Sequence, residues 1–364
     1  MKKILTALFA TALITLLLCG CSSSDHHSNE LTKVGMITDS GTIDDQSFNQ
    51  GVWEGIVNYQ TDMGTIDASY INPAGEQTSD YLTAITTLHD SGHEIIIAPG
   101  FVFETAVNEA AETFTDTTFI LIDGTTHSTE NQDFVEHDNT LCILFNEHEA
   151  GFLAGIASAL STTTNQLGFI GGMEIPSVVR YGVGFKAGVK YANQIFAINV
   201  ELQDDNYIYQ GGFTDIDAGK ALAADMYDND VDIIFSAAGL VGVGAISEAK
   251  ERAEQGDDVW AIGVDSDQYS IGLMDNGKSV ILTSALKRVD IATYRYIDSV
   301  LQGTFPGGEV ITLTLADNAL GLPDTNPNLA ADVESVCQIA ADEIAAGNVI
   351  VPSTAAELMN FLDL

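Results

Sequence analysis

Short apolar segments alternate with amphipathic segments along most of the chain. Runs rich in Val, Ile and Phe predict buried strands at 34–38, 65–71, 94–98, 118–122, 140–145, 167–170, 199–202, 232–236, 260–264 and 280–283. Apolar residues at helical spacing predict helices between them at 47–60, 77–91, 102–114, 147–160, 180–192, 215–227 and 242–255, and later at 328–348. This alternation is typical of parallel sheets covered by helices on both faces. The chain is therefore predicted to have an α/β fold.

The predicted strands end in polar or glycine-rich loops, where such sheets carry their functional residues. One group of loops follows the strands at 34–38, 94–98 and 118–122, and a second follows those at 167–170, 232–236 and 260–264. Two groups predict two sheets that face each other across a cleft. The polar segment 161–165 lies between the groups and is the predicted first crossover between two lobes.

The most informative segment is 34–56, in which a strand leads through a polar loop into a helix. The loop offers the carboxylates of Asp39, Asp44 and Asp45, and the helix begins with Phe48 and Asn49. An aromatic ring beside an amide and carboxylates suits a flat, polar and uncharged ligand. Asp44 and Asp45 have a second interpretation, because carboxylates commonly cap a helix start.

Residues 1–20 are predicted to be a secretory signal peptide: two lysines, an apolar run over 4–18, and a small-residue end. The last four residues, Leu18-Cys19-Gly20-Cys21, resemble a bacterial lipobox, so Cys21 is the predicted lipidation site. Residues 21–32 are predicted to be a disordered tether. An ordinary signal peptide and a membrane anchor stay open, although the apolar run is shorter than the ~20 residues that span a bilayer.

Length and charge limit the class of protein further. The ~330 residues after the leader exceed the size at which a single core usually stops growing, so two lobes are expected. Removing the leader leaves 11 basic residues against 52 acidic ones, a net charge of −41. This charge repels nucleic acid, anionic lipid and phosphorylated metabolites. It does not repel a neutral ligand.

Other motifs are too incomplete to predict a cofactor or a metal. The two remaining cysteines, Cys142 and Cys337, sit among apolar residues and are predicted to be buried free thiols. Gly242-Val-Gly244 lacks the third glycine of a dinucleotide loop. The acidic run 228–232 lacks the glycine of a calcium loop.

Several motifs in order along the chain resemble the basic membrane protein family of substrate-binding lipoproteins, and specifically its purine-nucleoside receptors. They are Thr38-Asp-Ser-Gly with Asp44-Asp-Gln-Ser-Phe-Asn, Glu149-Ala-Gly-Phe-Leu-Ala-Gly, Val183-Gly-Phe-Lys-Ala-Gly, Ile262-Gly-Val-Asp-Ser-Asp-Gln-Tyr and Leu282-Thr-Ser-Ala-Leu-Lys-Arg. The resemblance implies a periplasmic binding protein type I-like fold, with two Rossmann-like lobes joined by a hinge. The expected lobes are 33–162 plus 281–310 and 163–280 plus 311–364.

The resemblance also implies roles for single residues. Phe48 and Phe213 would stack on the two faces of a base, with Tyr207 or Tyr209 as alternatives for the second face. Asp39 and Asn49 would bind the edge of the base. The implied sugar contacts are Asp123, Asp265 and Lys287, and Gly239 would let the backbone approach closely. From the sequence alone, Phe48 could instead face the core, and Lys287 with Arg288 could be a surface pair that begins a helix.

The implied protein is a monomeric, lipid-anchored, extracytoplasmic receptor without cofactor or metal. It would deliver adenosine, guanosine or inosine to the permease subunits of an ABC importer and would not bind nucleic acid. Two alternatives remain open. One is a secreted nucleoside hydrolase that uses the acidic loop of Asp39, Asp44 and Asp45, and the other is a nucleoside-sensing surface lipoprotein.

Overall fold

The computed structural model describes residues 31–361. The predicted signal peptide, the lipidation site Cys21 and nearly all of the predicted tether lie outside the described residues. Within residues 31–361, no helix combines the length and the apolar character needed to cross a bilayer.

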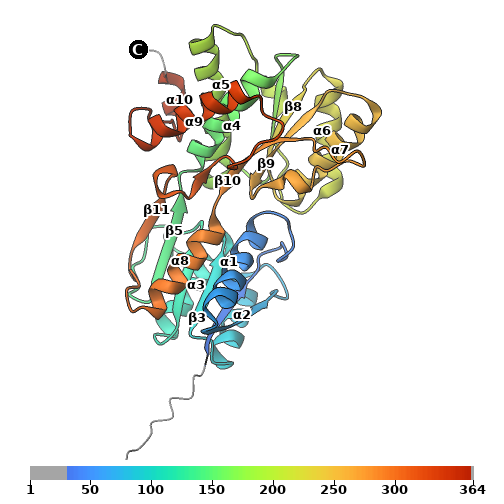
Figure 1. Ribbon diagram of the computed structural model, residues 1–364. Coiled ribbons are helices and arrows are strands. Elements are labelled where there is room, and N and C mark those ends of the chain that lie inside the picture. The colour runs from blue at the N-terminus through green and yellow to red at the C-terminus, as the bar shows by residue number, and fades with distance from the viewer. Residues whose placement is uncertain (1–30, 362–364) are drawn as a thin grey trace, which may run out of the picture. The chain divides into compact units, whose positions relative to one another are not determined.

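The first sheet has the strand order β11-β5-β4-β3-β1-β2, and all of its neighbouring strands are parallel. Its strands are β1 (Thr32–Ile37), β2 (Ile66–Ile71), β3 (Ile95–Pro99), β4 (Thr118–Ile122), β5 (Thr140–Phe145) and β11 (Val310–Leu313). The helices beside these strands are α1 (Phe48–Met63), α2 (Thr78–Asp90), α3 (Glu104–Thr113) and α8 (Val289–Leu301) (Figure 1). We call this part of the chain the first lobe.

The second sheet has the strand order β12-β10-β9-β8-β6-β7, in which only the β10–β12 pair is antiparallel. Its strands are β6 (Leu167–Gly171), β7 (Tyr207–Tyr209), β8 (Ile233–Ala237), β9 (Trp260–Asp265), β10 (Ile281–Lys287) and β12 (Leu320–Gly321). Its helices are α4 (Glu147–Ser161), α5 (Pro176–Phe196), α6 (Ile216–Asp228), α7 (Leu240–Gln255), α9 (Ala331–Ala345) and α10 (Ala355–Asn360) (Figure 1). This is the second lobe.

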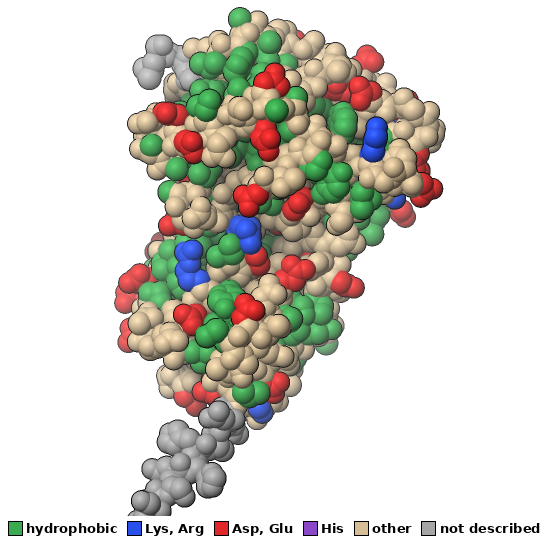
Figure 2. Space-filling model, in the orientation of Figure 1, with side chains coloured by type: hydrophobic (Ala, Val, Ile, Leu, Met, Phe, Trp, Pro, Cys, Tyr) green, Lys and Arg blue, Asp and Glu red, His purple; other side chains and the backbone are tan. Residues whose placement is uncertain are grey.

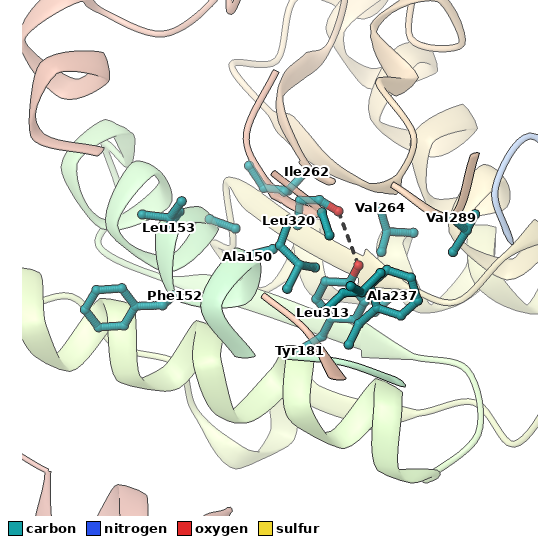
Figure 3. Packing of buried hydrophobic residues seen from close by; sticks show 14 of the residues in the cluster. Ala150, Phe152, Leu153, Tyr181, Ala237, Ile262, Val264, Val289, Leu313 and Leu320 are labelled. Atoms are coloured by element: carbon teal, nitrogen blue, oxygen red, sulfur yellow. Dashed lines mark hydrogen bonds between the residues drawn. The ribbon is translucent and has the colours of Figure 1, made fainter. Parts of the chain in front are cut away.

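The two sheets confirm the predicted α/β class. The central strands β3, β6 and β8 are buried along their full lengths, as expected for strands covered on both faces. Figure 3 shows how apolar side chains from helices, strands and later segments meet in the largest cluster of buried residues, among them Phe152, Tyr181, Ile262, Val289 and Leu320.

One predicted strand, 199–202, is absent. Both polar atoms of the Asn193 side chain bond the backbone of Val200, at 2.8 and 2.9 Å, and only a single bridge joins Gln166 to Glu201. The side chain of Asn193 thus takes the hydrogen bonds that a neighbouring strand would make at Val200. The edge position of the sheet goes to β7 instead, which the sequence pattern did not predict.

The chain crosses between the lobes three times. The first crossover lies at Asn146, between β5 and α4, and the segment 161–165 instead forms a loop whose Thr162 and Thr163 bind Asp232. The second crossover lies at Arg288, between β10 and α8, and the third lies between β11 and β12.

These crossovers differ from the grouping expected from the sequence. The expected first lobe includes 281–310, yet β10 belongs to the second sheet. The expected second lobe includes 311–313, yet these residues belong to β11 of the first sheet. Hydrophobic periodicity shows that these segments carry apolar positions but not which sheet they join. The exact lobe boundaries stay a proposal.

Glycines explain why α4 joins the second lobe. A Cβ atom added to Gly151 or Gly155 would lie 2.3 Å from a backbone oxygen of α5, and one added to Gly184 or Gly188 would lie 2.1 Å from a backbone oxygen of α4. The two helices therefore approach backbone to backbone, which side chains at these positions would prevent.

Candidate ligand-binding site

A pocket lies where the two lobes face each other, at the carboxyl ends of the strands. About 100 Å³ of it has room for a water-sized sphere. Residues that follow β1, β3 and β4 line it from the first lobe, and residues that follow β8 and β9 line it from the second. All eight predicted ligand-binding residues line this pocket: Asp39, Phe48, Asn49, Asp123, Phe213, Gly239, Asp265 and Lys287.

The start of α1 is fixed by Asp45. The two carboxylate oxygens of Asp45 accept from the backbone N–H groups of Ser47, Asn49 and Gln50 at 2.9–3.0 Å. Asp45 is therefore a helix cap, as the alternative interpretation proposed. This cap sets the orientation of Phe48 and Asn49, the first two residues of α1.

Asn49 is 3% exposed and bridges two acids. Its Nδ2 donates to Asp39 Oδ1 and to Asp45 Oδ2, both at 2.9 Å, while its Oδ1 is buried without a partner. A buried carbonyl oxygen without a hydrogen bond is costly, so a donor from a ligand would stabilise this arrangement. Burial raises the pKa of the neighbouring Asp39 carboxyl group.

Asp123 and Asp265 present carboxylates from opposite lobes in the same backbone conformation. Asp123 follows β4 with φ of 60°, and Asp265 ends β9 with φ of 62°. Residues other than glycine rarely adopt this left-handed conformation, and it costs of order 1–3 kcal/mol. Burial raises the pKa of both carboxyl groups, to about 6 for Asp123.

Lys287 is buried, with 3% of its surface exposed, so its interpretation as part of a surface pair is wrong. Its Nζ donates to Asp123 Oδ2 and, at 2.9 Å, to Glu147 Oε1. It also lies 5.1 Å from the centroid of the Phe48 ring, within the range of a cation–π contact. Burial lowers the pKa of Lys287, but Asp123 and Glu147 raise it by more, so the net shift is upward.

Each lobe contributes an aromatic ring to the pocket, Phe48 from the first and Phe213 from the second. Tyr207 and Tyr209 do not line it. Tyr207 instead stacks on Phe169 inside the second lobe, with ring centroids 4.6 Å apart, and its hydroxyl group pairs with that of Tyr209 at 3.3 Å. Of the three candidates for the second face, only Phe213 is available in the pocket.

Two glycines make room for Phe213. A Cβ atom on Gly172 would lie 2.2 Å from the Phe213 ring. Gly239 has φ of 56° and ψ of −131°, a conformation open essentially to glycine alone, and a Cβ atom there would lie 3.2 Å from the Phe213 carbonyl oxygen. Gly239 therefore lets the backbone approach Phe213, and its predicted close approach to the ligand stays a prediction.

Sequence reasoning missed several residues at the site. Ser47 and Tyr181 line the pocket, and both donate to Asp265, at 2.5 and 3.4 Å. Glu147 and Arg180 lie behind it and pair with each other at 2.5 Å. Glu147 lies close to the motif that begins at Glu149. Acidic residues are common at helix starts, so its charge alone did not indicate a role at the site.

Hydrogen bonds join the rims of the two lobes directly. The Gln46 carbonyl oxygen, in the first lobe, accepts from Gln268 Nε2 at 2.8 Å and from Ser266 Oγ at 3.3 Å, both in the second. Ser47 and Asp265 add a third link. Gln46 has φ of 59°, so its backbone is held in a strained conformation at this contact.

Among residues 31–361, no group of three or more His, Cys, Asp or Glu side chains is arranged to hold a metal ion. Asp44 accepts a hydrogen bond from the Thr42 hydroxyl group, and Asp45 caps α1. These two carboxylates of the acidic loop therefore have different structural roles.

The chain is similar in sequence to one protein family and to several named proteins of other organisms. The sequence profile described as "ABC transporter substrate-binding protein PnrA-like" matches residues 32–355. A Listeria innocua protein named CD4+ T-cell-stimulating antigen is 34% identical over 349 residues, 92% of this chain and 93% of that protein. The ABC transporter nucleoside-binding protein BmpA of Lactococcus lactis is 30% identical over 97% of this chain and its own full length. Basic membrane protein A of Borreliella burgdorferi is 30% identical and covers 100% of this chain and 99% of its own.

Solved structures show the same fold at lower identity. An ABC transporter solute-binding protein from Aeropyrum pernix superposes with a TM-score of 0.76 at 24% identity, covering 91% of this chain and 96% of that one. A similar protein from Conexibacter woesei gives 0.65 at 19% identity, covering 88% and 99%. These likenesses confirm the periplasmic binding protein type I-like fold. Because the family profile covers nearly all of the described residues, the chain belongs to the family of PnrA-like ABC transporter substrate-binding proteins.

Proposed function

We propose that this protein binds a purine nucleoside between its two lobes and delivers it to the permease of an ABC importer. The observation that supports this proposal most directly is the lining of the pocket. It combines aromatic rings from opposite lobes, Phe48 and Phe213, with carboxylate groups. A flat base suits the rings, and vicinal hydroxyl groups suit the carboxylates. The name of the Lactococcus lactis relative points to the same ligand class.

In this proposal Asp39 and Asn49 bind the edge of the base. Asp123, Asp265 and Lys287 bind the ribose. One stacking contact adds ~0.5–1.5 kcal/mol beyond burial, and a hydrogen bond to a charged group adds ~1.5–3 kcal/mol. Two rings and three charged contacts would together contribute ~5.5–12 kcal/mol beyond burial, a range that includes the ~8 kcal/mol that corresponds to micromolar affinity.

The cellular context follows from the same family. We propose an extracytoplasmic monomer, attached to the membrane through a lipid on Cys21. Nucleotides are expected to bind poorly, because a phosphate group would enter a pocket lined by Asp39, Asp123 and Asp265. A nucleoside-sensing role for the same fold would be favoured if the gene stood apart from genes for permease and ATPase subunits.

We also propose that the protein does not hydrolyse its ligand. A hydrolase that uses the acidic loop would need free carboxylates, whereas both oxygens of Asp45 bond backbone N–H groups of α1. Incubation with inosine separates the two functions. A receptor returns intact inosine, and a hydrolase releases hypoxanthine and ribose, which chromatography resolves.

Calorimetric titration of the soluble protein with adenosine, guanosine, inosine, uridine, adenine, ribose and AMP tests the ligand class. We expect purine nucleosides to bind with micromolar or lower Kd, and adenine, ribose and AMP at least tenfold more weakly. Phe48→Ala and Asp265→Ala should each weaken nucleoside binding by roughly tenfold or more, the loss of one stacking or charged contact. Unchanged affinity in both variants would overturn the site, and heat from ribose alone would overturn the ligand class.

A further inference from the structure

Four charged side chains form a row that begins at the pocket wall, with Asp123 and Lys287, and continues behind it, with Glu147 and Arg180. Asp123 pairs with Lys287, Lys287 with Glu147 at 2.9 Å, and Glu147 with Arg180 at 2.5 Å. The exposed fractions of these side chains are 10%, 2%, 0% and 21% from Asp123 to Arg180. The row holds two acids and two bases and is therefore neutral. Such a row is stable only while every member keeps its partners.

The row lies at the crossovers between the lobes. Lys287 is the last residue of β10, directly before the second crossover, and Glu147 is the first residue of α4, directly after the first. Asp123 follows β4 in the first lobe, and Arg180 lies on α5 in the second. The Lys287–Glu147 pair thus links two segments that are 140 residues apart in the sequence.

Both carboxylate oxygens of Glu147 are engaged by other side chains. Its Oε1 accepts from Lys287 and its Oε2 from Arg180, and it does not line the pocket. Lys287 does line the pocket. An ammonium group has three donors, of which Asp123 and Glu147 use two. Asp123 Oδ1 is buried and has no partner.

We infer that Glu147, held in place by Arg180, is a positioning residue. It keeps the Lys287 ammonium group hydrogen-bonded to two carboxylates at once, those of Asp123 and Glu147. This arrangement leaves Asp123 Oδ1 and one Lys287 N–H free as an acceptor and a donor for the ligand. Without the charge of Glu147, Lys287 has Asp123 as its one remaining carboxylate in the row and turns fully toward it. The inference rests on the proposed function, in which this acceptor and donor bind the ribose hydroxyl groups.

A double-mutant cycle tests the inference. Glu147→Gln should weaken nucleoside binding at least tenfold, and Lys287→Met should weaken it at least as much. If Glu147 acts only through Lys287, the double variant should bind no more weakly than Lys287→Met alone. A full, multiplicative effect of Glu147→Gln in the Lys287→Met background, or wild-type affinity in Glu147→Gln, would overturn the inference.

Glu149→Gln is the matched control. Glu149 is a buried acid on the same turn of α4, but it bonds Asn146 and the Leu315 backbone N–H rather than Lys287. It should change stability without changing nucleoside affinity. An equal loss of affinity in Glu147→Gln and Glu149→Gln would show that loss of any buried acid at this crossover weakens binding. That outcome would refute the positioning role of Glu147.

A measurement without ligand separates this inference from the proposed function. Reductive methylation of the ligand-free protein, followed by peptide mass mapping, reports how accessible the Lys287 amine is. We expect labelling of Lys287 at least tenfold faster in Glu147→Gln than in the wild type and in Glu149→Gln. Absence of nucleoside binding by the wild type would remove the proposed function, whereas equal labelling rates would remove the positioning role of Glu147.

Discussion

At the scale of single residues, Asp123 and Asp265 show the cost of building this pocket. Each sits at the end of a buried strand, with its φ near +60° and its carboxyl group largely removed from water. The strained backbone and the burial both disfavour the folded state. Such strain is typical of functional sites, and here it aims an acceptor from each lobe into one pocket.

Acidification should weaken nucleoside binding with a midpoint near the pKa of Asp123. Burial raises that pKa from its ordinary value to about 6, so the carboxylate takes up a proton between pH 7 and 5. Protonation removes the charge that Lys287 and the ligand use. Calorimetric titrations between pH 8 and 5 should show affinity falling through about pH 6.

Stability should respond to the same proton with the opposite sign. Because the folded state binds the proton of Asp123 more tightly than the unfolded state, the free energy of unfolding contributed by this group decreases as pH rises from about 4 to 6. Asp123→Asn should remove both trends. An unchanged step in affinity in that variant would assign the step to another group.

Phe213→Ala should weaken nucleoside binding by about tenfold, the loss of one stacked ring. The matched variant is Tyr209→Ala, which removes a ring that lies outside the pocket, where its hydroxyl group pairs with that of Tyr207, and it should bind as the wild type does. Titration of both variants with one purine nucleoside decides between the candidates for the second stacking face. A loss in Tyr209→Ala with none in Phe213→Ala would reverse the assignment.

At the scale of elements, the contact between α4 and α5 anchors the first crossover. The two helices approach through the glycines at 151, 155, 184 and 188. Glu147 at the start of α4 and Arg180 on α5 then meet beside this contact. The glycine contact therefore helps to fix the part of the charged row that lies behind the pocket.

Gly184→Ala should lower the free energy of unfolding by ~1–3 kcal/mol, because its Cβ would lie 2.1 Å from the backbone oxygen of His148. Gly242→Ala, in α7, is the control. Its nearest neighbour, the Ser236 side chain, would be 3.3 Å away, a much looser contact than the one at Gly184, and helix propensity favours alanine by up to ~1 kcal/mol. Urea unfolding of the two variants should give changes that differ clearly. Equal midpoints would refute backbone-to-backbone packing at Gly184.

At the scale of the whole molecule, excess negative charge dominates. The sequence carries a net charge of −39, and Figure 2 shows acidic side chains spread over the visible face of both lobes with few basic ones between them. Mutual repulsion of these charges opposes the compact state. Inside the pocket, by contrast, Lys287 offsets part of the charge of the surrounding carboxylates.

Salt should therefore stabilise the protein. The Debye length falls from about 8 Å at physiological ionic strength to about 3 Å at 1 M, which screens repulsion between exposed acids. We expect the Tm to rise by several degrees between about 0.05 M and about 2 M NaCl. A non-ionic solute at equal osmolality serves as the control. Equal Tm values at both salt concentrations would show that surface repulsion has little effect on stability.

The sequence by itself determined the α/β class, most strands, and the polar strand exits and the helix start that carry six of the eight predicted pocket residues. Period and polarity identify strands and their polar exits because both are local properties, and in parallel sheets the exits gather at one edge. The resemblance to a known family added Phe213 and Lys287, which no local pattern distinguishes from core or surface residues.

Only the tertiary structure decided which lobe receives α4 and β10, that Phe213 rather than Tyr207 lines the pocket, and that Glu147 and Lys287 meet. Periodicity tells that a side chain is buried but not what it is buried against. The partners of Lys287 lie 140 and 164 residues away in the sequence. Their pairing depends on crossovers that are set by packing such as the glycine contact of α4 with α5, which becomes visible only when both helices are in place.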